Sequence, residues 1–383
     1  MQPESGAAAI YLDYNATTPV LPEIEEALRP YIGGRFGNPS SDHEFGRDAA
    51  AGVALGRRQV ADLLGASPDE IVFTSGGSEA DNWALVGRVW ASGVPTPHLV
   101  TSQVEHPAIL ATCHFLERLG AEITYLPVDT TGRVDPDDVA RALRSTTVLV
   151  SIMHANNEVG TIQPIPEIAA VCRRAGIPLH SDAAQSVGKI PARVDDLGVD
   201  LLTVAGHKLY APKGVGALYV RRGTALEPLI HGAGHEGGRR AGTENVAWIV
   251  GLGAAAELAR RTMSSERARQ RALRERLHRA LDEQSGPVTL NGHPDERLPN
   301  TLNLRFSGVD GNAVLAATPT VAASTGSACH AGQSEPSPVL LAMGIQPDEA
   351  IGAVRLSLGR LTTAEDIERA AEALGATVRA QRG

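Results

Sequence analysis

Short apolar runs alternate with segments of helical spacing through the middle of this chain, and that alternation constrains its fold most strongly. The predicted strands are Ile71–Thr74, His98–Ser102, Thr147–Met153, Ile177–His180 and Leu201–Val204. Segments with helical spacing, among them Ala80–Val89 and Pro166–Arg174, lie between them. The pattern predicts βα units and a mainly parallel sheet, with Val215–Val220 as an added antiparallel strand.

The pattern changes near residue 251. From Gly251 to Gln284 the sequence is long, charged and amphipathic, which predicts one long helix joining two domains. Candidate strands at Thr301–Phe306 and Val354–Leu358 predict a smaller α/β domain after that helix. We therefore expect an α/β protein with a large domain over residues 16–250 and a small domain formed by residues 1–15 and 251–383.

Composition argues against several classes of function. The 383 residues carry a formal net charge of −9 without a block of basic residues, so no nucleic-acid or anionic-membrane surface is expected. The first nine residues do not form a signal peptide, and no apolar run is long enough to span a bilayer. Three cysteines are too few for a disulfide framework and favour a reducing cytoplasm, where a free thiol stays reactive.

Polar and ionisable residues follow five successive predicted strands. They are Ser75–Glu79, then Glu105 and His106, then His154 and Asn156–Glu158, then Asp182 and Gln185, and finally His207 and Lys208. In open α/β sheets, ligands bind outside the carboxyl ends of the strands. The sequence therefore predicts one shared pocket at that edge of the sheet.

Four of these groups suit a phosphorylated aromatic aldehyde. The Ser75–Ser78 turn between a strand and a helix could bind phosphate, and Lys208 could form a Schiff base. Asp182 could keep a pyridinium nitrogen protonated, and His106 could stack on a flat ring. Each group also has a purely structural interpretation. The turn and Asp182 could be helix caps, Lys208 could be a surface lysine, and His106 could be a core histidine. Those alternatives do not explain why the four groups occur at successive strand ends, so the set indicates pyridoxal phosphate, with no metal expected.

A run of small residues surrounds Cys329, from Ala323 to Gly332. Such a run predicts a mobile loop with an accessible thiol, and a reactive rather than a structural cysteine. Cys113 and Cys172 lie in segments of apolar helical spacing, where we expect them to pack in the interior.

With these features in place, the chain resembles the class V aminotransferase-like pyridoxal-phosphate enzymes, specifically the cysteine desulfurases and the similar selenocysteine lyases. The resemblance covers nearly the whole chain. The matching motifs are Tyr11–Pro19, Gly37–Ser41, Thr74–Asn82, Val104–His106, Asn156–Gly160, Ser181–Gln185, Gly206–Lys208, Ala241–Asn245, the Cys329 segment with Glu335–Ser337, and Val354–Ser357. It implies the fold-type I architecture of pyridoxal-phosphate transferases.

The resemblance also implies a role for each matching residue. The catalytic residues would be Lys208, which forms the Schiff base and moves protons at the substrate Cα, His106, which handles the thiol proton, and Cys329. The cofactor contacts would be Gly77, Ser78, His106, Asp182, Gln185, His207 and Lys208, with Thr243 reaching the phosphate of the other subunit of a homodimer. Asn157 and Arg355 would hold the substrate carboxylate, which an arginine binds through two parallel hydrogen bonds.

The implied reaction converts L-cysteine to L-alanine and leaves the sulfur on Cys329 as a persulfide for a sulfur-acceptor protein. Three alternatives stay open: a selenocysteine lyase, a non-catalytic sulfur-transfer scaffold and an ordinary aminotransferase. The segment Thr325–Met343 resembles selenocysteine lyases and also desulfurases that serve many acceptors. Many desulfurases carry a phosphate-binding serine just before the His-Lys pair, whereas this chain has Ala205 before Gly206, which would remove one hydrogen bond.

Overall fold

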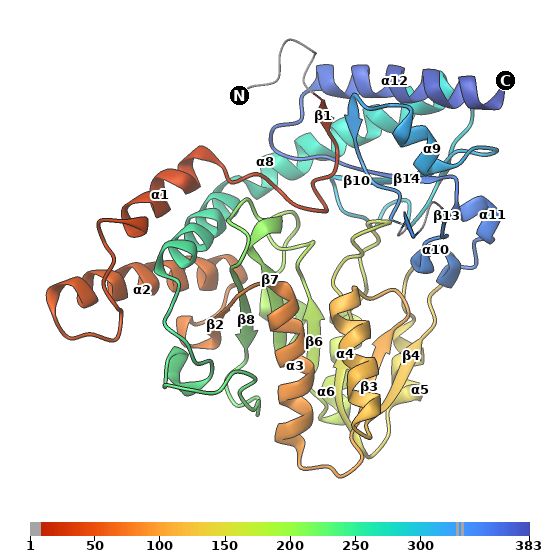
Figure 1. Ribbon diagram of the computed structural model, residues 1–383. Helices are drawn as coiled ribbons and strands as arrows, with labels where there is room; N and C mark the ends of the chain where they lie inside the picture. Colours follow the sequence, from red (N-terminus) through yellow and green to blue (C-terminus); the bar gives the residue numbers. More distant parts are fainter. Residues whose placement is uncertain (1–8, 327–328, 331–332) are drawn as a thin grey trace.

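The computed structural model describes residues 9–326, 329–330 and 333–383. Within that part of the chain, seven strands form a central sheet in the order β2-β8-β7-β6-β5-β3-β4 (Figure 1). The strands are β2 (Ile71–Thr74), β3 (His98–Ser102), β4 (Glu122–Leu126), β5 (Thr147–Ser151), β6 (Leu179–Asp182), β7 (Leu201–Ala205) and β8 (Gly216–Val220). Strands β3 to β7 are parallel, and β8 is antiparallel to both of its neighbours. The predicted sheet, including its antiparallel strand, is confirmed.

Strand β4 was absent from the predicted set for a physical reason. It lies at the edge of the sheet beside β3, and only Leu126 among its residues is buried. A half-exposed edge strand does not need the continuous apolar run that marks a strand buried on both faces. Strand β6 also departs from the prediction, because it begins at Leu179 and extends to Asp182. The carboxylate of Asp182 therefore belongs to the strand itself.

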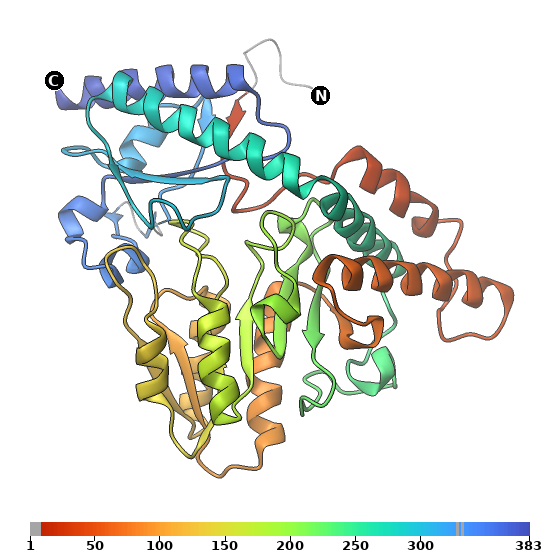
Figure 2. The ribbon, with the colours of Figure 1, turned by 180° about the vertical axis from the view of Figure 1, so that it is seen from behind.

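Helices cover both faces of the sheet, as expected for βα units. Helices α3 (Gly77–Ser92) and α4 (Pro107–Arg118) pack on the face seen in Figure 1. Helices α5 (Pro136–Ala142) and α6 (Ile165–Ala175) lie on the opposite face, seen in Figure 2. The helical predictions for Ala80–Val89 and Pro166–Arg174 are confirmed, with each helix slightly longer than its apolar pattern.

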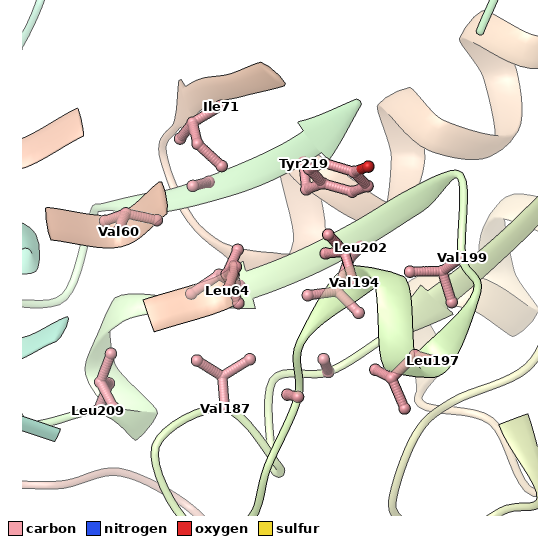
Figure 3. Close-up of a cluster of buried hydrophobic side chains, with 14 of the residues drawn as sticks. Val60, Leu64, Ile71, Val187, Val194, Leu197, Val199, Leu202, Leu209 and Tyr219 are labelled. Carbon is pink, nitrogen blue, oxygen red and sulfur yellow. The ribbon is translucent and has the colours of Figure 1, made fainter. Parts of the chain in front are cut away.

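The larger hydrophobic core joins the sheet to helix α2 (Glu44–Leu64). Figure 3 shows Val60 and Leu64 of α2 close to Ile71 of β2, Leu202 of β7 and Tyr219 of β8. All five side chains are almost fully buried. Burying an aliphatic or aromatic side chain of this size contributes roughly 1.5–3 kcal/mol relative to leaving it exposed. This core fixes the strands whose carboxyl ends are described below.

The predicted long helix is α8 (Val246–Ser285), which runs from beside α1 and α2 to beside α12 (Figure 1). Beyond it, β9, β10 and β14 form an antiparallel sheet that buries a second core. The remaining elements are β1 (Ile10–Tyr11), α1 (Pro22–Ile32), α7 (Val194–Leu197), β9 (Thr289–Leu290), β10 (Thr301–Arg305), α9 (Gly311–Ala316), β11 (Val321–Ala322), β12 (Cys329–His330), β13 (Gln333–Ser334), α10 (Pro338–Ala342), α11 (Pro347–Ala350), β14 (Ala353–Ser357) and α12 (Ala364–Arg382), with short 3₁₀ turns at Pro68–Glu70, Gly206–Lys208 and Glu236–Gly238.

The division into residues 16–250 and residues 1–15 with 251–383 stays a proposal. It is supported by the separation of the two cores, because Ile10 and Leu12 pack with residues of the C-terminal third of the chain. Strand β1 pairs in parallel with β11, which ties the N-terminal segment to the small domain. Among the described helices, none combines the length and the apolar character needed to cross a bilayer.

Candidate functional site

A cavity of about 780 Å³ lies at the carboxyl ends of the parallel strands. It is lined by most of the residues that the sequence singles out: Gly77, Ser78, His106, Asn157, Asp182, Gln185, His207, Lys208 and Arg355. The prediction that these residues share one pocket at the carboxyl ends of the strands is therefore confirmed. Within that set of site residues, Thr243 is not part of this lining, and the side chain of Cys329 lies outside the described part of the structure.

One end of the cavity is formed by the turn between β2 and α3. The N-terminus of α3 opens on the cavity at Gly77 and Ser78, where unpaired backbone N–H groups and the helix dipole favour an anion. Gly76 has φ of 151°, a conformation that suits glycine. The Ser75 N–H donates to Glu79 Oε2 at 2.8 Å, and Glu79 forms an ion pair with Arg240. These two contacts fix the conformation of the turn.

Asp182 lies on the cavity wall at the end of β6. Its side chain is buried, and its Oδ1 accepts a hydrogen bond from the Ala184 N–H at 2.8 Å. Burial raises the pKa of this carboxyl, while the Ala184 N–H and the nearby His106 and Lys208 act in the opposite direction. A buried carboxyl with this environment is suited to pairing with a cationic group of a ligand.

His106 is the N-cap residue of α4, and its Nδ1 accepts from the Ala108 N–H at 3.1 Å. The turn before it is anchored by Glu105, whose carboxylate accepts from Ser102 Oγ and from the Met153 N–H. Burial lowers the pKa of His106, with Asp182 opposing that shift and Lys208 adding to it. The imidazole is therefore neutral near pH 7, and because its Nδ1 accepts the Ala108 N–H, its ring proton lies on Nε2.

Lys208 follows β7 and projects its amine toward the N-terminal segment. Its Nζ donates to the carbonyl oxygens of Asn15 and Ala16 at 2.6 and 2.7 Å. Burial, reinforced by Arg355, lowers the pKa of Lys208 to about 8, against smaller opposing effects of Asp182 and Asp13. Such an amine is a far better nucleophile near neutral pH than an ordinary lysine.

Burial also keeps the imidazole of the neighbouring His207 neutral. Burial, and then the charge of Lys208, lower the pKa of His207 to about 4. Its Nδ1 lies 3.2 Å from Thr17 Oγ1, and its carbonyl accepts from Thr18 Oγ1. These contacts fix the Gly206–Lys208 turn against the N-terminal segment.

Arg355 comes from β14 of the smaller C-terminal sheet and reaches the same cavity. Its NH2 donates to Asp13 Oδ1 at 2.7 Å, and its NH1 donates to the Asn157 carbonyl at 3.2 Å. Its Nε is buried and has no hydrogen-bond partner among the described residues. A buried guanidinium with spare donors at a cavity wall suits a ligand carboxylate.

Thr243 is a predicted site residue that lies outside the lining of this cavity. Thr243 lines a smaller cavity of about 140 Å³, which shares Ser75, Gly214 and Val215 with the main one. The backbone of Cys329 pairs with that of Ser334 between β12 and β13, and the mobile loop with an accessible thiol stays a prediction. The accessibility of the Cys329 thiol lies outside the described part of the structure.

The other two cysteines are core residues, which confirms the prediction for them. Cys113 and Cys172 are buried, and burial raises the pKa of each thiol to about 12. A thiol with that pKa is almost wholly protonated at neutral pH and is a poor nucleophile.

Sequence reasoning assigned no role to Asn15, although it joins several parts of the site. Its carbonyl accepts from Lys208 and from Gln185 Nε2, and its side-chain amide donates to the Asn157 carbonyl and to Thr301 Oγ1. The strand-end argument could not find it, because it precedes the first strand of the central sheet.

Asp81 is a second missed residue. It is buried on the cavity wall within α3, and its Oδ1 has no hydrogen-bond partner among the described residues. Burial, followed by the charge of Asp182, raises the pKa of its carboxyl well above the ordinary value. Its position one helical turn after Gly77 is the signal that places it on the same face of α3.

Comparison with known protein families and sequences gives a consistent result. The chain matches the model of the aminotransferase class-V family over residues 10–370. It is 50% identical over 360 residues to "Cysteine desulfurase IscS" of Dictyoglomus turgidum, a match that covers 94% of this chain and 91% of the relative. A protein of the same name from Methanosarcina thermophila is 47% identical over 367 residues, covering 95% of this chain and 90% of the relative.

Solved structures show the same likeness. A structure described as "NIFS-LIKE PROTEIN" superposes with a TM-score of 0.90 at 34% identity, covering 96% of this chain and 98% of the other. The structure of "SspA in complex with cysteine" superposes with a TM-score of 0.81 at 40% identity, covering 91% of this chain and 98% of the other.

Proposed function

This chain belongs to the aminotransferase class-V family, and from that membership we propose that its cavity binds pyridoxal phosphate and acts on L-cysteine. The chain is a cysteine desulfurase, as are its named relatives at 50% and 47% identity over more than nine-tenths of its length. The observation that carries the cofactor proposal is the convergence of Lys208, Asp182 and the N-terminus of α3 on one cavity.

The donor set of the cavity fits this cofactor. The N-terminus of α3 offers backbone N–H groups to a phosphate, and Asp182 offers a buried carboxylate to a pyridinium nitrogen. His106 offers a flat ring and Gln185 an amide for the ring hydroxyl. The methyl group of Ala205 lies beside Gly77, so we propose that one phosphate hydrogen bond found in many desulfurases is missing here.

When bound, pyridoxal phosphate supplies an aldehyde that condenses with amines and a ring that accepts electron density from the substrate Cα. Lys208 would hold the cofactor through that aldehyde and would move the proton at the substrate Cα. Asp182 would hold the ring nitrogen in its protonated form. His106 would handle the proton of the substrate thiol, and its Nδ1, the unprotonated nitrogen, would release the Ala108 N–H to take it.

Arg355 and Asn157 bind the substrate carboxylate and thereby orient the amino acid. Because Arg355 is held by Asp13 and by the Asn157 carbonyl, its guanidinium is already in place before substrate arrives. A pre-positioned donor binds with less loss of side-chain entropy than a mobile one.

Cys329 accepts the sulfur atom. Its thiolate forms an S–S bond to the substrate sulfur as the substrate Cβ–S bond breaks, and the electron pair of that bond returns to the substrate carbon. Protonation of the carbon then gives L-alanine, while the sulfur stays on Cys329 as a persulfide for an acceptor protein. The small residues around Cys329 favour an accessible thiol.

A homodimer completes the proposal, with Thr243 reaching the phosphate bound by the partner. The position of Thr243 beside its own cavity, and not in it, supports this arrangement. Phe36 and Phe45 stack with ring centroids 5.6 Å apart although they are 71% and 55% exposed. An exposed aromatic pair suits a protein interface. We place the dimer in the cytoplasm, where Cys329 would remain reduced.

Lys208 is expected to react with aldehydes at unusually low pH. In protein stripped of cofactor, reductive methylation of Lys208 with formaldehyde should rise with pH and level off near pH 8, because the neutral amine is the nucleophile. At pH 7 about a tenth of Lys208 is neutral, against about one in three thousand ordinary lysines. Peptide mass spectrometry at each pH measures the methylation rate, with an N-acetyl-lysine peptide as reference. A rate that keeps rising to pH 10 would contradict the lowered pKa.

The substrate is tested by parallel turnover of L-cysteine and L-selenocysteine. We expect alanine and sulfide in equal amounts from L-cysteine, with dithiothreitol present to release the persulfide sulfur. Turnover confined to L-selenocysteine would favour the lyase alternative. Transamination of a 2-oxo acid without sulfide release would favour an ordinary aminotransferase.

A further inference from the structure

Lysine is rare in this chain and confined to one place. Among 35 lysines and arginines only Lys189, Lys208 and Lys213 are lysines, and every other basic residue is an arginine. Lys208 and Lys213 line the main cavity, and Lys189 lies directly behind it against Gln185. Where a positive charge alone is needed, the chain uses arginine. A lysine in this setting indicates a need for a compact ammonium group.

The backbone places Lys189 with little freedom. The preceding Gly188 has φ of 78°, and a Cβ at that position would come within 2.1 Å of Leu209 Cδ1. The turn is closed by the Lys189 N–H, which donates to the Ser186 carbonyl at 2.9 Å. Lys189 therefore follows a glycine that both conformation and close packing require.

Lys189 has no acidic partner within ion-pairing distance among the described residues. Its Nζ donates to Gln185 Oε1 at 2.8 Å. Burial lowers the pKa of Lys189 to about 7, and Lys208 and Arg355, both cations, lower it further. The small void beside Lys189 is also lined by Tyr14, Tyr210, Glu266, Arg267 and Arg360. His207 lies near enough for the charge of Lys189 to help lower its pKa. A partly buried lysine without a carboxylate is costly, so its contact with Gln185 calls for an explanation.

The contact determines which way the Gln185 amide faces. An ammonium can only donate a hydrogen bond, so the atom that meets Lys189 must be the amide oxygen. A backbone carbonyl can only accept, so the atom 2.9 Å from the Asn15 oxygen must be Nε2. These two partners together favour this orientation of the amide over the flipped one. One Nε2 hydrogen remains for the cavity, which Gln185 lines.

We propose that Lys189 is a positioning residue that fixes Gln185 as a hydrogen-bond donor toward the ring hydroxyl oxygen of the cofactor. The proposal rests on the proposed function. A donor at that oxygen stabilises its ionised form and lowers the proton affinity of the bound cofactor. Without Lys189, the Asn15 carbonyl alone would hold this orientation. An amide that flips would present its oxygen to the ring oxygen, and two acceptors would then face each other.

The test uses the cofactor-loaded protein and follows its visible absorption as the pH is changed. Replacement K189M removes the ammonium and keeps a similar apolar stem, and it should raise the pH midpoint of the absorption change by about one unit, a tenfold change in proton affinity. Replacement K189Q offers a donor that can also flip, and it should shift the midpoint by less than K189M.

A matched control separates positioning from a general loss of charge. Arg267 lines the same void but forms no contact with Gln185, and R267M should leave the midpoint unchanged. An equal shift in R267M and K189M would overturn the positioning role. So would a K189M protein that melts at a lower temperature yet titrates like wild type, because that result describes a residue that only fills space. A wild-type protein that takes up no cofactor would overturn the proposed function itself.

Discussion

Replacing Lys208 with alanine is expected to reduce alanine formation from L-cysteine by about a thousandfold or more. Lys208 is proposed to act twice, as the attachment point of the cofactor and as the base that moves the Cα proton. A positioned general base alone contributes about 10²–10⁴-fold in rate. Its pKa of about 8 places enough neutral amine in the cavity for both roles at neutral pH. Alanine release, measured by amino-acid analysis, gives the rate.

The conservative variant K208R separates the loss of the reacting amine from the loss of its positive charge. Arginine keeps the positive charge beside Asp182 and Arg355, but its guanidinium does not condense with an aldehyde under these conditions. We therefore expect K208R to be as inactive as K208A. Either variant retaining a tenth of wild-type turnover would show that Lys208 is not the reacting amine.

Replacing Cys329 with alanine is expected to reduce sulfide release by at least about a hundredfold while cofactor uptake stays unchanged. The thiol is the proposed acceptor of the substrate sulfur, and no described cysteine can replace it. Cys113 and Cys172 are buried, with pKa values of about 12. Sulfide release and visible absorption are measured on the same sample, which separates loss of sulfur transfer from loss of cofactor.

The matched control is C172A, which removes a cysteine that packs in the core. It should retain turnover within about threefold and lose only some stability, since a small cavity replaces the thiol. Mass spectrometry after one turnover should find one added sulfur atom on the Cys329 peptide of wild type. Sulfide release at the wild-type rate from C329A would refute the persulfide role.

The cavity could be predicted from sequence because its residues obey a rule of topology. Parallel strands end on one edge of a sheet, so Asp182 and Lys208 had to lie near each other once the strands were recognised. Arg355 obeys no such rule. It comes from β14, on a different sheet, and only the resemblance to a family suggested it. Residues that reach a site from a second sheet leave no local pattern in the sequence.

Asn15 and Lys189 show a second limit. Both act through hydrogen bonds to other site residues, so their importance depends on tertiary contacts that propensity and periodicity do not contain. Strand β4 shows a third, because half-exposed edge strands lack a continuous apolar run.

The single helix α8 has a consequence for how the protein loses its structure. Its 40 residues span about 60 Å, with Leu252 and Ala256 in one core and Leu277 and Leu281 in the other. If either core melts, the half of α8 that it supports loses the tertiary packing on which most helical stability in proteins depends. The loss then reaches the turns of α8 that adjoin the other core. Unfolding of the two cores is thus coupled, because both pack on one continuous helix.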